Sequence, residues 1–390
     1  MKVSILCADL SSNCLGRSYI LARVLERRYE TEIVGPAFGE GIWEPLAADS
    51  FDYRAWPMKR SATSAPDLRR LSDWVDGDVI YANKPLAASY GVGLWARLKH
   101  PRPLVLDIDD WDAAFVREAW RGLSGWPRLR YLLGSTLRPH LNHGLWNNLV
   151  FDRLIGHADR RTVSNSFLAR NFGGALVWHG RDTDAFRPGK WDRRDLRRRH
   201  GLDPDERIVA FLGTLRPHKG VNDLVEALAG MGPGAPSLLL VGVGDDPESH
   251  ATLGVAKTRL AGRVHCFGPQ RFDRLPEFLS LADAAVVPQR DSPATRGQMP
   301  AKLFDAMALG VPVISTAVSD IPSVLEGAGW VVAPNSPGAL RAAIAERFDD
   351  PAEATRRSAI ARERCVERFS WDAMARDLSG VFAPLEAQAR

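Results

Sequence analysis

Residues 297–315 combine the start of a predicted helix with a lysine and an acid. Pro300 suits the first turn of that helix, because proline has no N–H group to satisfy there, and Gly310 suits its end. A helix start presents unpaired N–H groups and the positive end of the helix dipole, which favours a phosphate. Lys302 would add a cation, and Asp305, one turn later, would accept the hydroxyls of a ribose. A surface helix whose lysine and aspartate are only solvated fits the same pattern.

A second basic segment, residues 213–220, reads Gly-Thr-Leu-Arg-Pro-His-Lys-Gly. It follows an apolar stretch at 207–212 that predicts a strand, and it precedes a helical pattern at 221–231. A glycine-bounded turn with Arg216 and Lys219 at a helix start is suited to hold a pyrophosphate. Backbone N–H groups and cations then face the same oxygens.

Three acids within four residues, Asp107, Asp109 and Asp110, follow a predicted strand at 103–108. Carboxylates this close repel one another unless a cation, hydrogen-bond donors or solvent intervenes. A metal-binding Asp-x-Asp pair would require a single-domain nucleotide fold, which the rest of the chain contradicts. A phosphatase nucleophile loop does not accommodate Trp111. Capping of the next helix by these acids remains open.

The composition fits a protein of two domains, since one domain usually has about 100–200 residues and this chain has 390. The net charge of +4 permits anionic ligands or an anionic membrane surface. A nucleic-acid binder would show a denser basic stripe, so we expect no nucleic-acid partner. The four cysteines form no CxxC pair, which predicts reduced thiols in a cytoplasmic protein and no metal site.

Strand and helix patterns alternate along the chain, beginning with a strand at 2–9, a helix at 17–28 and a strand at 30–34. The alternation returns between residues 207 and 288. It predicts an α/β fold with doubly wound parallel sheets. Because a strand starts at once, we expect no signal peptide, and no run of about 20 apolar residues is present to span a bilayer.

Residues 299–305, Met-Pro-Ala-Lys-Leu-Phe-Asp, and the run that follows to Ser315 resemble the donor-site segment of retaining, family-4 glycosyltransferases of the GT-B fold. Many members carry Glu, seven residues and a second Glu before such a run, and a subgroup carries Pro-x-Lys-Leu-Phe-Glu. The sequence departs from this pattern at two positions. Asp305 is one methylene shorter than the second Glu, and Gly297 stands where the first Glu would be.

The resemblance covers nearly the whole chain and is specific for residues 205–335. Residues 176–188 are similar to the family's Asn-Gly-Val-Asp-x-x-x-Phe-x-Pro, with His179 in place of the usual Asn and Arg181 in place of an aliphatic residue. The resemblance implies that nine residues bind the donor: Gly213, Arg216, Lys219, Gly242, Val264, Met299, Pro300, Lys302 and Asp305.

The implied fold is GT-B, an α/β fold of two Rossmann-like doubly wound parallel-sheet domains that face an interdomain cleft. We expect an N-terminal acceptor-binding domain at 1–187 and a C-terminal nucleotide-sugar-binding domain at 188–370. A C-terminal helix at 371–390 is expected to cross back to the first domain.

On the acceptor side, the resemblance places the loops after the strands at 2–9 and 103–108 in the cleft. Candidates for contacts with the acceptor or a phosphate in the first loop are Ser12, Asn13 and Gly16, for which a plain connecting turn is the alternative. Candidates in the second loop are Asp107 and Asp109. Of these, Asp109 best matches the position where relatives often carry a His.

The implied function is transfer of a sugar from a UDP- or GDP-sugar to the hydroxyl of a glycan, a lipid-linked molecule or a small molecule. Retention of configuration without a metal or another cofactor is expected, with Asp109, Arg216 and Lys219 as catalytic residues. The sequence offers no clear carboxylate for a double displacement, so we expect same-face attack assisted by the leaving phosphate. A GT-B sugar-nucleotide epimerase and a non-catalytic nucleotide-sugar-binding protein remain alternatives.

Residues 111–157 are dense in tryptophan, arginine and leucine. Tryptophan is enriched at the level of lipid headgroups and arginine attracts anionic lipid, so the segment predicts a patch that binds the inner face of the cell membrane. Helices that cover a sheet with their arginines in water are the alternative. The tryptophans of the segment are Trp111, Trp120, Trp126 and Trp146, and its arginines include Arg117, Arg121, Arg128, Arg130 and Arg138. We expect Trp120, Trp126 and the nearby arginines to contact the membrane.

Overall fold

The computed structural model describes residues 1–137, 140–142 and 144–387, so Arg138 lies outside the described residues. The chain divides into two compact units. Unit 1 is Met1–Trp178 together with Met374–Arg390, and unit 2 is His179–Ala373. The boundaries between the units lie at 178/179 and 373/374, whereas the sequence predicted domain boundaries at 187/188 and 370/371. Residues 388–390 of the predicted last helix are not described.

Unit 1 is built on a seven-stranded parallel sheet in the order β3-β2-β1-β4-β5-β6-β7. The strands are β1 (Lys2–Leu6), β2 (Glu30–Ala37), β3 (Tyr53–Pro57), β4 (Val79–Asn83), β5 (Leu104–Ile108), β6 (Arg160–Val163) and β7 (Ala175–Leu176). Their order reverses between β1 and β4. In doubly wound sheets such a reversal marks the ligand-binding crevice at the carboxyl ends of the strands.

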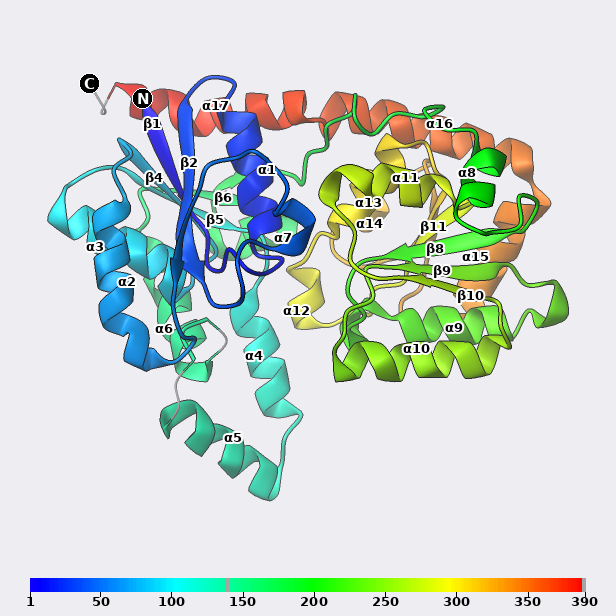
Figure 1. Cartoon of the computed structure of the whole chain (residues 1–390), viewed down its shortest axis with the longest axis horizontal. Helices are drawn as coiled ribbons and strands as arrows, with labels where there is room; N and C mark the ends of the chain where they lie inside the picture. The colour runs from blue at the N-terminus through cyan, green and yellow to red at the C-terminus, as the bar shows by residue number, and fades with distance from the viewer. Residues whose placement is uncertain (138–139, 143, 388–390) are drawn as a thin grey trace. The chain divides into compact units, whose positions relative to one another are not determined.

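Helices cover both faces of this sheet, with α2 and α3 on one side and α1 on the other (Figure 1). The helices of unit 1 are α1 (Leu15–Leu25), α2 (Ala65–Leu71), α3 (Val92–Lys99), α4 (Asp112–Arg121), α5 (Gly125–Leu137), α6 (Leu145–Leu154) and α7 (Ser166–Phe172). The final helix, α17 (Trp371–Glu386), packs Phe382 against Tyr29 and Tyr81, with ring centroids 5.9 and 5.3 Å away. This contact ties the end of the chain to unit 1.

Unit 2 has a six-stranded parallel sheet in the order β10-β9-β8-β11-β12-β13, which reverses between β8 and β11. The strands are β8 (Ile208–Leu212), β9 (Ser237–Val241), β10 (Val264–Phe267), β11 (Ala284–Val287), β12 (Val313–Thr316) and β13 (Trp330–Val332). The strands β8, β9, β11 and β12 are buried along their whole length, as their apolar sequences require.

Figure 1 shows α9 and α10 side by side along one face of the unit 2 sheet and α11 and α13 along the other. The helices of this unit are α8 (Arg193–Arg199), α9 (Val221–Ala229), α10 (Pro247–Leu260), α11 (Leu275–Ser280), α12 (Pro293–Arg296), α13 (Ala301–Ala308), α14 (Ile321–Val324), α15 (Pro337–Asp349) and α16 (Pro351–Arg368). The predicted alternation of strands and helices and the doubly wound parallel sheets are therefore confirmed in both units.

Candidate functional site

The carboxyl ends of β8 and β9 in unit 2 are brought together by two glycines. Gly213 follows β8 with φ +114°, and Gly242 follows β9 with φ +91°. A Cβ atom on Gly242 would lie 3.3 Å from the Cα of Gly213, and Gly213 N donates to the carbonyl of Val241 at 2.8 Å. L-residues with side chains rarely adopt such φ values, so both positions favour glycine. Because glycine has no side chain, a ligand can approach the backbone at these strand ends.

Lys219 approaches this edge from the next turn, a short 3-10 helix at Pro217–Lys219. Gly220 begins α9 in the left-handed conformation, and a Cβ atom there would lie only 1.9 Å from the carbonyl oxygen of Pro288. Glycine is therefore required for the turn to close. The Nζ of Lys219 donates to Thr214 Oγ1 at 2.6 Å and would lie 3.9 Å from a Cβ on Gly213.

Lys302 reaches the same point from the first turn of α13. Its Nζ would lie 3.3 Å from a Cβ on Gly213 and is 3.7 Å from the centroid of the Phe211 ring. Burial, followed by the charge of Lys219, lowers the pKa of Lys302 well below its ordinary value of 10.5. Two lysine ammonium groups therefore converge on one glycine, an arrangement that an anionic ligand would stabilise.

Asp305 lies on α13 and is buried, with one carboxylate oxygen accepting a hydrogen bond from Nε of Arg181. Arg181 is buried too, and its Nη1 donates to the carbonyl of Gly180 at 2.9 Å. Its backbone is held between Phe369 and Trp371. Two of the four positions at which this sequence differs from the motifs it resembles, Arg181 and Asp305, therefore contact each other, which was not predicted from the sequence.

Arg216 is engaged with two carboxylates at the start of α10. Its Nη1 lies 2.8 Å from Asp246 Oδ1 and 2.8 Å from Glu248 Oε2. Hydrogen bonds from Ser249 and then the charge of Arg216 lower the pKa of Asp246 to about 2. The structure thus brings Lys219 and Lys302 together at Gly213 and pairs Arg216 with acids.

The other predicted donor residues lie on neighbouring segments of unit 2. Val264 begins β10 and is partly buried, and Met299 is buried. Pro300 was predicted in the first turn of a helix and is instead the N-cap of α13, one residue before that turn. Gly310 follows the end of the helix with φ +63°, as predicted.

In unit 1, the loop between β1 and α1 carries the first group of acceptor-side candidates. Ser12 Oγ donates to the carbonyl of Asp9 at 3.3 Å, and Asn13 is exposed. Gly16 lies inside α1, where a Cβ atom would be 3.5 Å from the ring of Trp43. No role for these residues beyond the turn follows from these contacts.

Asp107, at the end of β5, is fully buried and saturated with donors. Arg17 binds it through Nε at 3.1 Å and Nη2 at 3.0 Å. Asn83, Thr162 and Tyr81 donate to the same carboxylate at 2.8, 2.7 and 3.4 Å. This network joins α1, β4, β5 and β6, so the carboxylate is used inside unit 1.

Asp109, two residues later, has a different environment. It is 7% exposed, and its Oδ1 has no hydrogen-bond partner among the described residues. Lys84 Nζ lies 3.4 Å from that oxygen. Burial raises the pKa of Asp109 to about 7, against the opposing effect of Lys84. A carboxyl group with a pKa near neutrality is suited to accept or donate a proton.

Lys84, which faces Asp109, Asp110 and Asp112, was not predicted from the sequence as a site residue. The signal for it was present, since adjacent carboxylates predict a nearby cation and Lys84 directly follows β4, which pairs with β5. The first 150 residues contain many other lysines and arginines, and the sequence alone does not tell which of them lies beside these acids. Only the fold identifies Lys84 as that residue.

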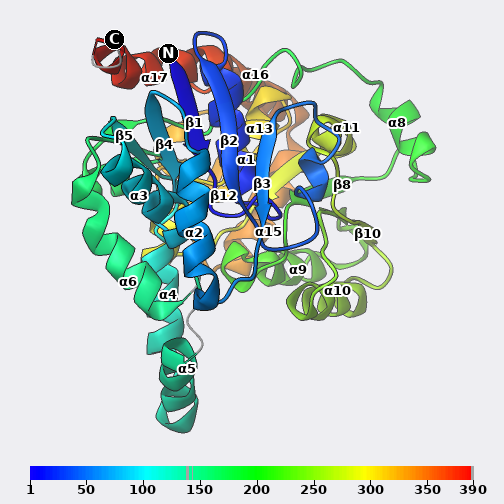
Figure 2. The ribbon, with the colours of Figure 1, turned by 60° about the vertical axis from the view of Figure 1, so that its left-hand side comes forward.

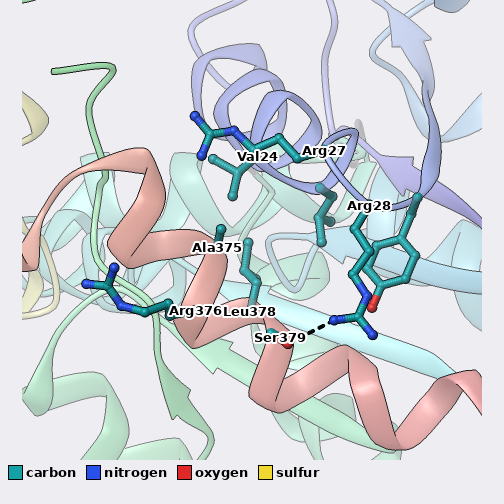
Figure 3. A pocket seen from close by; sticks show the side chains of 9 residues that line it. Val24, Arg27, Arg28, Ala375, Arg376, Leu378 and Ser379 are labelled. Atoms are coloured by element: carbon teal, nitrogen blue, oxygen red, sulfur yellow. Dashed lines mark hydrogen bonds between the residues drawn. The ribbon is translucent and has the colours of Figure 1, made fainter. Parts of the chain in front are cut away.

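Unit 1 also contains a pocket of about 270 Å³, whose lining side chains are drawn in Figure 3. It is formed by the end of α1 and by α17, with Val24, Leu25 and Leu378 as its apolar part and Arg28 bonded to Ser379 at 3.5 Å. Since Tyr29 leads directly into β2, this pocket lies at the amino ends of the strands. Ligands of doubly wound sheets bind at the opposite edge.

Among the described residues there is no group of three or more His, Cys, Asp or Glu side chains arranged to hold a metal ion. In the same part of the chain, every helix is too short or too polar to cross a membrane.

Comparison with known proteins gives matches on both sequence and structure. Residues 192–364 match the family model described as Glycosyl transferases group 1. The lipopolysaccharide core biosynthesis mannosyltransferase LpsB of Rhizobium meliloti (strain 1021) is 29% identical over 268 residues, 66% of this chain and 74% of the relative. A GDP-mannose-dependent alpha-(1-6)-phosphatidylinositol monomannoside mannosyltransferase of Mycobacterium tuberculosis is 32% identical over 209 residues, 51% of this chain and 53% of the relative.

Solved structures resemble the whole chain. Sucrose-phosphate synthase of Thermosynechococcus elongatus has a TM-score of 0.76 at 20% identity, with complete coverage of both chains. HepE of Anabaena in complex with UDP-glucose has a TM-score of 0.74 at 18% identity and covers 98% of this chain and 100% of its own. These likenesses establish the GT-B fold of two Rossmann-like units, and residues 192–364, which lie within unit 2, are similar to the glycosyl transferases group 1.

Proposed function

We propose that the protein transfers a sugar from a nucleoside-diphosphate sugar to an acceptor hydroxyl, with retention of the anomeric configuration. The convergence of Lys219 and Lys302 on Gly213 carries this proposal. When the bond between the anomeric carbon and the diphosphate breaks, its electrons pass to the phosphate oxygen, and the leaving group gains negative charge. Cations already fixed at that position stabilise the transition state more than the ground state.

The acceptor oxygen forms the new bond to the anomeric carbon on the same face and gives up its proton. Asp109 is the group in unit 1 suited to take that proton or to orient the hydroxyl, because its carboxyl group is buried with a raised pKa. Asp305 would hold the ribose, and the diphosphate would need no metal ion beside the two lysines. The donor base stays open between uracil and guanine: one relative is GDP-mannose-dependent, and HepE binds UDP-glucose.

A donor screen tests this function. The purified protein would be mixed with UDP- and GDP-sugars, with and without lipid-linked, glycan and small-molecule acceptors, in the presence of EDTA. We expect acceptor-dependent release of one nucleoside diphosphate and a product whose NMR coupling constant shows the donor's configuration. Release of free epimerised sugar nucleotide would favour an epimerase, and tight binding without turnover would favour a binding protein.

We also propose that the protein binds the cytoplasmic face of the membrane through α5 and α6. Among the described residues, ten large hydrophobic side chains are exposed, and six of them lie between residues 126 and 150. Helix α5 has no buried residue and lies at the far end of α4, away from the sheet of unit 1 (Figures 1 and 2). The six are Trp126, Leu129, Leu133, Leu137, Trp146 and Val150.

The charges near this surface favour an anionic membrane. Arg121, Arg128 and Arg130 are exposed, and α5 contains no acid. Trp120 is partly buried, with the Arg128 guanidinium 4.4 Å from the centroid of its ring, whereas Trp126 is 67% exposed. Trp126 rather than Trp120 is therefore positioned to enter the headgroup layer.

Vesicle flotation tests this surface. We expect recovery with vesicles containing about 30% phosphatidylserine and little recovery with phosphatidylcholine alone. Trp126→Ala/Leu133→Ala should abolish the difference, while Leu98→Ala, at an exposed position of α3, should leave it unchanged. Equal recovery with both vesicle types would contradict the proposal.

A further inference from the structure

Lys84 occupies an unusual position at the carboxyl end of β4. It is a lysine in the left-handed conformation, with φ +71°, and its side chain is 7% exposed. A non-glycine residue in this region is uncommon and costs about 1–2 kcal/mol. Backbone bonds hold it there, since its N–H donates to the carbonyl of Asp107 at 2.8 Å and its carbonyl accepts from Ser89 Oγ at 2.8 Å. The left-handed turn directs a buried ammonium group toward the loop after β5.

Three carboxylates of that loop surround the ammonium group. Lys84 Nζ lies 2.7 Å from Asp110, 3.2 Å from Asp112 and 3.4 Å from Asp109. Asp110 and Asp112 accept hydrogen bonds from it, whereas the near oxygen of Asp109 accepts none. The lysine therefore anchors the loop through two acids and leaves one buried carboxylate oxygen of the third available for another donor.

We propose that Lys84 is the positioning residue of the acceptor site: it fixes the loop that carries Asp109 and supplies the cation beside its carboxylate. This inference rests on the proposed function, in which Asp109 receives the proton of the acceptor hydroxyl. The acceptor hydroxyl is the donor that would complete the hydrogen bonding of the free oxygen of Asp109. A strained backbone that places one side chain is a frequent feature of functional sites.

The charges around Asp109 determine in which direction its pKa should shift when a neighbouring charge is removed, and this direction can be measured. Lys84 and Arg17 lower the pKa of Asp109, and Asp110 and Asp107 raise it. Lys84 also faces Asp112 and the Cys14 thiol, whose pKa burial raises to about 11. Removal of the lysine should therefore raise the pKa of Asp109, and removal of the charge of Asp110 should lower it.

The experiment measures kcat/KM for the acceptor between pH 5 and 9 at saturating donor. Because the base form of Asp109 is the active one, the wild-type rate should fall as the pH drops through its pKa. Lys84→Met should move this acid limb upward by about one to three pH units, since a unit charge at this distance has that effect. Asp110→Asn should move it downward, so the two variants shift in opposite directions.

The controls separate this inference from the function on which it rests. Lys99→Met, at a surface lysine bonded to Asp73, should leave the limb in place. Lys84→Arg should largely restore the wild-type profile. If Asp109→Asn keeps both the rate and the limb, the proposed role of Asp109 is wrong. If Asp109→Asn abolishes the limb while Lys84→Met only lowers the rate equally at all pH values, Lys84 is a structural residue and this inference is overturned. Asp110→Asn serves as the test if Lys84→Met does not fold.

Discussion

Both units present charged side chains at the carboxyl ends of a parallel sheet, but with opposite arrangements. In unit 2, the ammonium groups of Lys219 and Lys302 converge on a glycine. In unit 1, three aspartates surround the single ammonium group of Lys84. The unit 1 cluster contains its own countercharge, and the pKa of Lys84 is raised well above its ordinary value although burial opposes this. The pKa of Lys302 is lowered instead.

The difference between the two charge clusters indicates which of them would bind an ion. A buried charge is stable when an opposite charge lies beside it, and a pair of like charges is not. An anion such as a diphosphate would therefore stabilise the lysine pair of unit 2. The acid cluster of unit 1 is complete without an ion, and it offers one oxygen of Asp109 to a neutral hydroxyl.

The largest expected effect tests the unit 1 side of this comparison. Asp109→Asn should lower transfer by about 10²–10⁴-fold, the usual contribution of a general base. The affinity for the nucleoside-diphosphate sugar should stay within a factor of about three, since the change lies in the other unit. Calorimetric titration of the donor and steady-state transfer rates would measure both. Collapse of donor affinity with a normal rate at saturation would show that Asp109 has another role.

On the unit 2 side, Lys219→Ala should lower turnover by about 10²–10³-fold, the scale for losing one donor to a developing anion. It should also weaken binding of the nucleoside diphosphate, because that anion carries the same charge as the leaving group. Lys257→Ala, at an exposed position of α10, is the matched control and should change neither quantity. A Lys219→Ala enzyme with normal turnover would remove this lysine from the site.

Donor affinity should depend on pH through Lys302. Because its pKa is lowered in the free protein, the lysine loses its proton at a lower pH than an ordinary lysine does, and an anion favours its charged form. Binding should then take up a proton, and affinity should fall by up to about tenfold per pH unit above the lowered pKa. Titration calorimetry with UDP-glucose or GDP-mannose in two buffers of different ionisation enthalpy measures the uptake. Lys302→Arg, which stays charged, should bind without it, and equal heats in both buffers for the wild type would contradict the prediction.

The smallest functional effect is expected at Asp305. Loss of its contacts with a ribose should raise the donor KM by about tenfold with little change in kcat, because these contacts are present in both ground and transition states. Asp305→Ala also leaves Arg181 buried without its partner, which should cost about 3–5 kcal/mol of unfolding free energy. Asp305→Glu keeps the charge and should retain activity.

The double variant Arg181→Met/Asp305→Ala separates these two effects of Asp305. It removes the unpaired charge and should recover much of the stability measured by urea unfolding. The donor KM should remain raised, because the carboxylate is still missing. A stable double variant with a normal donor KM would show that Asp305 serves only to pair with Arg181.

Local sequence patterns predicted most of the regular elements. The predicted strand at 30–34 is confirmed as the first part of β2, and α1 begins two residues before the helix predicted at 17–28. Between β4 and β5, a single π turn at Ala87–Gly91 leads directly into α3. Two edge strands were not predicted. β3 contains Arg54 and ends in proline, and β13 has only three residues, so neither shows the apolar run of a central strand.

The sequence by itself determined the doubly wound fold and the Lys219–Gly220 turn, because hydrophobic periodicity and glycine requirements are local properties. Only the tertiary structure decided which charged groups pair. Arg181 meets Asp305 across 124 positions, and Arg216 meets Asp246 across 30. Lys84 meets Asp110 across 26. Each cation had several possible partners in the sequence, and the choice followed from which strand ends the sheet order brings together.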